Sequence, residues 1–148
     1  MKYSRQDVAF LRTVDLKTIV IACGTVSTTA LDVLAAENPI PVLGVVAPAA
    51  RAAARATRSG SVGLIGPQAS IRSGAYERLI RAANPAARVL AQPCPLFVPL
   101  VENGRFPPGD VVIETVAPEY LAPLQEAGVA TLLFGCTHYH LLEDVIGA

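Results

Sequence analysis

The chain has 148 residues, with twelve basic and twelve acidic side chains, so its formal net charge is zero. Such a balance lacks the basic surface expected for binding nucleic acid or an anionic membrane, and it favours a small-molecule or protein partner. Just over half of the residues are hydrophobic, yet no apolar run approaches the roughly 20 residues needed to cross a bilayer.

The N-terminus, residues 1–7, carries no apolar stretch of the kind that follows the basic start of a signal peptide. We therefore expect a soluble, cytoplasmic protein. The three cysteines, Cys23, Cys94 and Cys136, are far apart, odd in number and without C-x-x-C spacing. This pattern argues against a disulfide framework and against a zinc or redox site. We expect free thiols and neither a metal nor a cofactor.

Five short apolar runs do not alternate with polar residues, a pattern typical of parallel strands that are buried on both faces. These runs are residues 18–22, 42–46, 61–65, 88–91 and 131–134. Helical patterns are found in residues 4–14, 25–36, 48–58, 71–83, 97–103 and 109–127. The alternation predicts a doubly wound α/β fold with a parallel sheet. In the last of these helices, Pro118 and Pro123 predict a kink or a break.

Two of the predicted strands end in the same way. Residues 18–25 read TIVIACGT and residues 131–138 read TLLFGCTH, so each strand runs through a small residue into a cysteine. Cys23 and Cys136 therefore fall at the carboxyl ends of strands, where open α/β sheets bind ligands. Backbone amides and the following helix would favour the thiolate and bring the pKa below the usual value of about 8.5. The alternative is a pair of small buried residues that close two strands.

Two matched thiols that face each other across a small pocket suit racemisation. One thiolate removes a proton from one face of a carbon while the other thiol returns a proton to the opposite face. An α-proton is weakly acidic, so such a site must also stabilise a carbanion-like transition state and exclude water. A thiol redox protein is an alternative, and it would need both sulfurs within disulfide reach. Cys94 stands between two prolines with no nearby base, and we expect it to be structural.

Four segments resemble motifs of the glutamate racemases. Residues 22–27, ACGTVS, resemble A-C-N-T-A-S, and residues 135–140, GCTHYH, resemble G-C-T-H-Y-P. Residues 94–104, CPLFVPLVENG, are similar to C-P-L-F-V-P-L-V-E-x-G, and residues 62–76 are similar to V-G-x-I-G-T…I-x-S-x-x-Y. The resemblance runs over nearly the whole chain, and the combination is typical of glutamate racemases within the aspartate/glutamate racemase superfamily.

This resemblance implies a cofactor-independent isomerase that interconverts L-glutamate and D-glutamate and supplies D-glutamate for peptidoglycan. Cys23 and Cys136 would be the two proton-transfer groups. His138 and Glu102 would be auxiliary groups that set the protonation state of the neighbouring thiol and of the substrate. The substrate-binding positions would be Gly24, Thr25 and Thr137. Without the motif, His138 also fits a surface or helix-capping histidine, and Glu102 fits a solvated charge at a helix end.

The chain also departs from the family pattern. It has no counterpart of the apolar strand and Asp-Ser-Gly motif with which the family begins, nor of the segment that returns after Ala148 to complete the first domain. We therefore expect residues 1–45 to be a partial first racemase domain with Cys23, and residues 46–148 to be a complete, pseudo-symmetric second domain with Cys136. Gly24 replaces an asparagine that should bind the substrate, and His140 replaces a proline.

A partial first domain should expose an apolar edge, and such edges favour pairing with another chain. We therefore expect a homodimer. The departures also leave a second hypothesis open: a catalytically impaired, racemase-like protein that binds a small acidic metabolite or a protein partner.

Overall fold

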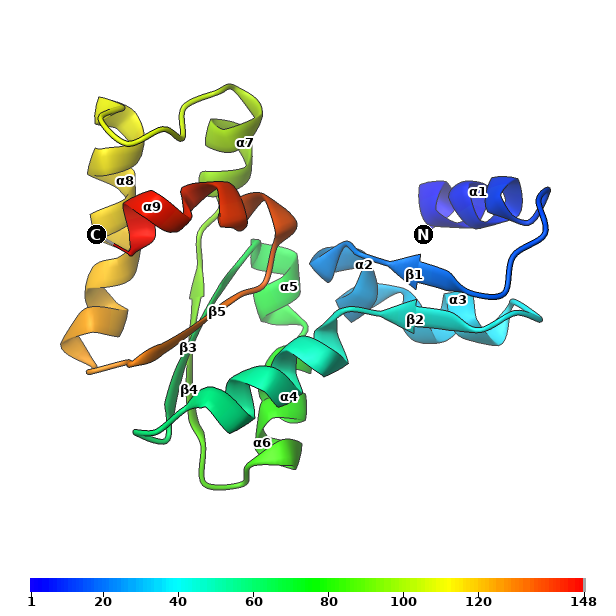
Figure 1. The fold of residues 1–148 in the computed structure, drawn as a ribbon, viewed down its shortest axis with the longest axis horizontal. Coiled ribbons are helices and arrows are strands. Elements are labelled where there is room, and N and C mark those ends of the chain that lie inside the picture. The colour runs from blue at the N-terminus through cyan, green and yellow to red at the C-terminus, as the bar shows by residue number, and fades with distance from the viewer. Residues whose placement is uncertain (148) are drawn as a thin grey trace.

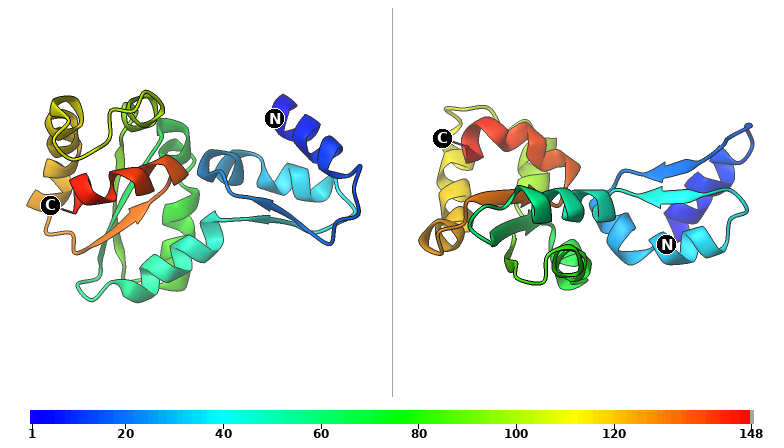
Figure 2. Two further views of the ribbon diagram at one scale, coloured as in Figure 1. Left: turned by 45° about the horizontal axis from the view of Figure 1, so that its top comes forward. Right: turned by 60° about the horizontal axis from the view of Figure 1, so that its bottom comes forward.

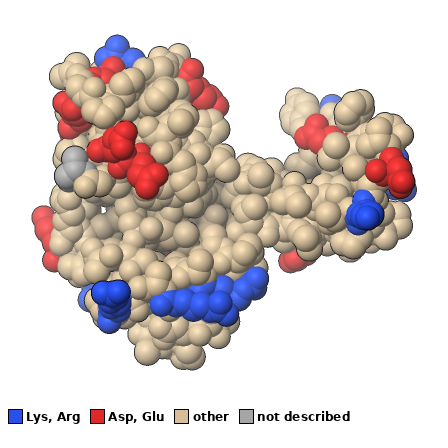
Figure 3. All heavy atoms as spheres, in the orientation of Figure 1, with Lys and Arg blue, Asp and Glu red and all other residues tan. Residues whose placement is uncertain are grey.

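A computed structural model describes residues 1–147 and shows two units of unequal size that are joined at a narrow neck (Figures 1 and 3). The smaller unit contains α1 (Lys2–Leu11), β1 (Ile19–Ile21), α2 (Gly24–Thr29), α3 (Leu31–Ala36) and β2 (Val42–Gly44). The larger unit contains α4 (Val46–Ala56), β3 (Ser61–Gly66), α5 (Gln68–Arg72), α6 (Ala75–Ala83), β4 (Arg88–Pro93), α7 (Phe97–Glu102), α8 (Val111–Glu126), β5 (Thr131–Phe134), η1 (Thr137–Leu142) and α9 (Glu143–Ile146).

All five predicted strands are present, and every pairing between them is parallel. In the smaller unit β1 pairs with β2, with Ile19 opposite Val42. In the larger unit the order is β4-β3-β5, so β3 is the central strand. The predicted parallel α/β class is therefore confirmed, although the strands form two separate sheets.

Helices cover both faces of the larger sheet, as a doubly wound fold requires (Figures 1 and 2). Val62 and Leu64 of β3 belong to clusters that include residues of α4 and α6. Ile65 belongs to a cluster built with residues of α7, α8 and η1. Because β3 lies between these clusters, its residues 62–66 are all buried.

The smaller sheet is covered on one face only. α1 and α3 lie on the same side of β1 and β2 (Figure 2, right), and Val8, Ile19 and Leu34 share a core there. On these strands Val20 is 60% exposed and Leu43 is 54% exposed. The prediction that all strands are buried on both faces is therefore wrong for β1 and β2, because no described helix covers the second face.

Two predicted helices are each divided in the structure. Residues 25–36 form α2 and α3, which meet at Ala30, where φ is −134°. Residues 71–83 are divided between α5 and α6 at Gly74, where φ is +63°, a left-handed conformation that glycine adopts without strain. Residues 137–146 form η1 and α9, and the sequence analysis did not predict them.

Of the predicted kink or break at Pro118 and Pro123, the break does not occur, because α8 runs continuously from Val111 to Glu126. The side chain of Asp110 caps its start by accepting hydrogen bonds from the backbone N–H groups of Val112 and Ile113. The buried face of α8 carries Ile113, Ala117, Leu121 and Leu124. Each large buried side chain contributes about 1.5–3 kcal/mol, which offsets the cost of about 3 kcal/mol for each proline.

No helix among the described residues is long and apolar enough to cross a membrane.

Candidate functional site

The two predicted catalytic cysteines occupy equivalent positions in the two units. Cys23 follows β1 and immediately precedes α2, and Cys136 follows β5 and immediately precedes η1. Cys23 is exposed and Cys136 is partly buried. Each cysteine therefore lies at the end of a strand, as the repeated sequence predicts, but their surroundings differ.

Cys94 is fully buried in the core of the larger unit. Burial raises the pKa of its thiol to about 12. The prediction that Cys94 is structural agrees with this position.

A close backbone contact joins the two units between the two cysteines. Gly24 follows Cys23, Gly135 precedes Cys136, and both glycines are buried. A Cβ atom on Gly24 would overlap the carbonyl oxygen of Gly135, so only a glycine fits at position 24 without a shift of the backbone. We call this pair, Gly24 and Gly135, the glycine seam. It brings the carboxyl ends of β1 and β5 together.

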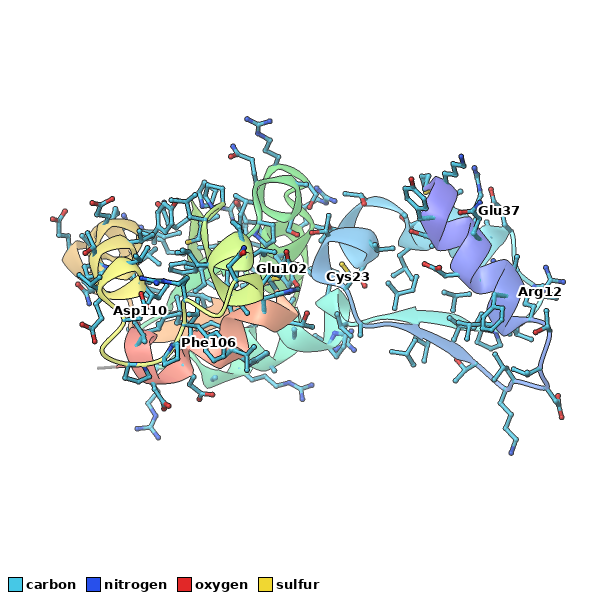
Figure 4. The ribbon with its side chains drawn as sticks, turned by 90° about the horizontal axis from the view of Figure 1, so that it is seen from above. Arg12, Cys23, Glu37, Glu102, Phe106 and Asp110 are labelled. Atoms are coloured by element: carbon cyan, nitrogen blue, oxygen red, sulfur yellow. The ribbon has the colours of Figure 1, made fainter. Side chains whose placement is uncertain are left out.

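A pocket of about 230 Å³ lies beside the glycine seam. Its lining residues are Ala22, Gly24, Val45, Ala49, Tyr76, Phe134, Gly135, Cys136, Thr137 and His140. The pocket thus brings together three of the predicted site residues, Gly24, Cys136 and Thr137. Cys23 lines a neighbouring hollow of about 190 Å³ with residues of α1 and β1, and it lies at the junction of the two units (Figure 4).

Cys136, His138 and Glu102 form a chain of neighbouring side chains. The Sγ atom of Cys136 lies 3.7 Å from Nδ1 of His138. On the other side of the imidazole ring, Nε2 of His138 lies 3.3 Å from Oε1 of Glu102, at the end of α7. A carboxylate on one ring nitrogen orients an imidazole and leaves the other nitrogen for proton exchange with the thiol. Because the Glu102 side chain is 61% exposed, this contact adds little to stability.

The expectation of a lowered pKa is wrong for Cys136. Burial is the largest effect on this thiol and raises its pKa. The backbone N–H groups of His138 and Tyr139 lower the pKa, as expected at a turn from a strand into a helix, but their effect is smaller. The negative charges of ionised Cys23 and Glu102 raise it further. Cys136 is therefore a neutral thiol, and hence a proton donor, near neutral pH.

Thr25 has a partner that the sequence analysis missed. Its hydroxyl lies 2.9 Å from the hydroxyl of Ser70, which is 1% exposed at the centre of α5. This hydrogen bond is a second connection between the two units beside the glycine seam. Ser70 lies within the segment that resembles the family, but the sequence pattern gave no reason to assign it a role.

Two lining residues of the pocket, Tyr76 and His140, were also not assigned to the site from the sequence. The ring centroid of His140 lies 5.4 Å from that of Phe134. The position of His140, two residues after His138 on the same turn, was the sequence signal that could have assigned it to the site.

Among the described residues, no group of three or more His, Cys, Asp or Glu side chains is arranged to hold a metal ion.

The different surroundings of the three thiols predict an order of alkylation by iodoacetamide near neutral pH. Exposed Cys23 should react first, and Cys136 should react more slowly than a free cysteine, because each unit of raised pKa lowers the thiolate fraction about tenfold. Cys94 should react only after unfolding. Mass spectrometry of the three peptides checks this order, with urea-unfolded protein as the control. Rapid native labelling of Cys94 would contradict the structure.

Substitution of Gly24 tests the glycine seam. Gly24→Ala should destabilise the fold by about 1–3 kcal/mol, because the added methyl group overlaps the Gly135 carbonyl. Gly66→Ala is the matched control, since a Cβ there would lie 3.3 Å from the mobile end of the Ile71 side chain. Urea unfolding followed by circular dichroism measures both variants. Equal unfolding midpoints would show that the seam is not tightly packed.

Comparison with known proteins agrees with this arrangement. The family model for Asp/Glu/Hydantoin racemase matches residues 9–148. The glutamate racemase of Geobacter metallireducens is 49% identical over 146 residues, which cover 99% of this chain and 53% of that protein. The glutamate racemase of Corynebacterium diphtheriae is 50% identical over 130 residues, which cover 88% of this chain and 48% of that protein. The chain thus spans about half the length of these curated relatives.

Solved structures show the same fold. A glutamate racemase isoform from Bacillus anthracis superimposes with a TM-score of 0.91 at 34% identity and covers 98% of this chain and 54% of that one. The glutamate racemase of Francisella tularensis, solved in complex with D-glutamate, gives a TM-score of 0.86 at 34% identity and covers 99% of this chain and 54% of that one. The sequence, the fold and the paired strand ends together lead to one conclusion: this chain belongs to the Asp/Glu/Hydantoin racemase family.

Proposed function

We propose that this chain carries the two-thiol centre of a glutamate racemase, which moves the α-proton of glutamate between the two faces of its α-carbon without a cofactor. The observation that carries the proposal is the meeting of two equivalent strand ends, each with a cysteine, at the glycine seam. The relatives named above are glutamate racemases, and one solved structure holds D-glutamate. The substrate and the activity of this chain follow from these relatives.

The surroundings of the two thiols favour a particular division of roles. A thiolate at Cys23 accepts the α-proton, and the electron pair left on the α-carbon takes a proton from the thiol of Cys136 on the other face. Cys136 suits the donor role because burial raises the pKa of its thiol, which therefore stays protonated. In the reverse direction Cys136 must become the thiolate, and His138, 3.7 Å from its sulfur, is placed to take up that proton. Glu102 orients the imidazole on its far side.

Other parts of the site support the binding of an amino acid. Thr137 lines the pocket beside Cys136 and offers a hydroxyl to a carboxylate or an amino group. Thr25 supports the wall of the site through its bond to Ser70. Gly24 has no side chain to offer, so its part in substrate binding is limited to its backbone.

The proposal predicts exchange of the α-proton of glutamate in deuterated water, which proton NMR measures as loss of the α-proton signal. Cys23→Ala and Cys136→Ala should each lower the exchange rate at least about 100-fold for one enantiomer, as expected for loss of a general acid or base. Cys94→Ala, checked for folding by circular dichroism, is the matched control and should retain exchange. Binding of glutamate without any exchange would instead support a non-catalytic, racemase-like protein.

The proposal includes a homodimer that forms through the uncovered face of the β1-β2 sheet. Val20 and Leu43 are apolar and exposed on its strands, and exposed apolar patches mark association sites.

The proposal also includes a cytoplasmic location without nucleic-acid or membrane partners, in keeping with a net charge of zero. On the face shown in Figure 3, the largest group of Lys and Arg forms a band over α4.

Sedimentation velocity at micromolar concentration tests the dimer. The wild-type chain should sediment as a dimer, and the double variant Val20→Asp with Leu43→Asp should sediment as a monomer, because buried unpaired carboxylates disfavour the interface. Val111→Asp, at a side chain that is 70% exposed on the larger unit, is the control and should leave the dimer intact. A monodisperse wild-type monomer would rule out this association.

A further inference from the structure

Tyr76 lies beneath the glycine seam, between the backbone neighbours of the two cysteines. Its hydroxyl oxygen is 3.1 Å from the position that a Cβ on Gly24 would take, and its Cε2 atom is 3.5 Å from the equivalent position on Gly135. The side chain is only 3% exposed, and it shares a buried cluster with Val46 and Leu64. Packing therefore fixes the ring, and the hydroxyl points at the place where the two units meet.

The hydroxyl of Tyr76 has no hydrogen-bond partner among the described residues. Buried tyrosine hydroxyls usually have one, and Tyr139 in this chain donates to the carbonyl oxygen of Cys94 at 2.8 Å. Every fully buried side-chain nitrogen or oxygen among the described residues is hydrogen-bonded. The Tyr76 oxygen must therefore be accessible, and since Tyr76 lines the pocket beside Cys136, it opens into that pocket.

The pocket offers hydrogen-bonding side chains to a ligand. Among the described residues that line it, none is Lys, Arg, Asp or Glu, and the polar side chains besides the Cys136 thiol are Thr137, His140 and Tyr76. Burial raises the pKa of Tyr76 to about 12, with further contributions from ionised Cys136 and Cys23. The phenol thus remains protonated over the range in which thiols titrate, and it can donate a hydrogen bond to an anion throughout that range.

We propose that Tyr76 is a substrate-binding residue, whose hydroxyl donates a hydrogen bond to a carboxylate oxygen of the amino acid held between Cys23 and Cys136. Gly24 permits this contact, because a side chain at that position would cover the hydroxyl. The inference rests on the proposed function, and it adds a donor that the sequence motifs did not assign to the site.

Tyr76→Phe removes the hydroxyl and keeps the ring. Two measurements test it: the protection of Cys136 from iodoacetamide by L-glutamate or D-glutamate, and the kinetics of α-proton exchange. A hydrogen bond to a charged acceptor is lost, so the glutamate concentration for half protection and the KM should both rise about tenfold. The kcat should change less than about threefold, because the contact is made equally in the ground state and in the transition state.

Tyr120→Phe is the matched control, because this tyrosine packs edge-to-face on Phe97 and does not line the pocket. It should leave protection and KM unchanged. Thermal unfolding of both variants separates a loss of binding from a loss of folding.

The outcomes distinguish this inference from the proposed function. If wild-type Cys136 is protected and Tyr76→Phe weakens the protection, the inference stands even when no proton exchange occurs. If exchange occurs and Tyr76→Phe leaves both KM and protection unchanged, the proposed function stands and the role of Tyr76 is overturned. Absence of protection of the wild-type chain by either enantiomer also overturns it.

Discussion

The backbone contact at the glycine seam is the constraint on which the rest of the site depends. A Cβ on Gly24 has no room against the carbonyl of Gly135, so the two units are in close backbone contact there. This contact brings the ends of β1 and β5 together and places Cys23 and Cys136 on either side of it. Two cysteines 113 positions apart in the sequence thereby come to lie beside the same backbone contact. The Thr25–Ser70 hydrogen bond supports the same approach.

The two cysteines share a sequence pattern but not an environment. Cys23 is exposed, whereas Cys136 is half-buried and also touches an imidazole. At Cys136 two backbone donors favour the thiolate, and desolvation outweighs them. Burial therefore favours the neutral thiol at Cys136. His138 and Glu102 lie in line with Cys136, whereas Cys23 lines a separate hollow.

Predictions of the fold succeeded where a local pattern has a single physical solution. Uninterrupted apolar runs favour parallel strands, and all five strands form as predicted, although β1 and β2 are buried on one face only. Predictions failed where packing competes with local preference. Pro118 and Pro123 do not break α8, because burial of one helix face outweighs their cost. Gly74 divides a predicted helix, because its left-handed conformation lets α5 and α6 take different directions.

The sequence by itself determined the parallel α/β class, the strand ends at Cys23 and Cys136, the proximity of His138 to Cys136, and the burial of Cys94. These features depend on short stretches of chain, whose apolar or polar character decides their place. Only the tertiary structure decided the hydrogen bond between Ser70 and Thr25, the position of Tyr76 beside the glycine seam, the direction of the pKa shift at Cys136, and the separation of Cys23 from the main pocket. Desolvation and contacts between distant segments arise from packing, and no local pattern of residues contains them.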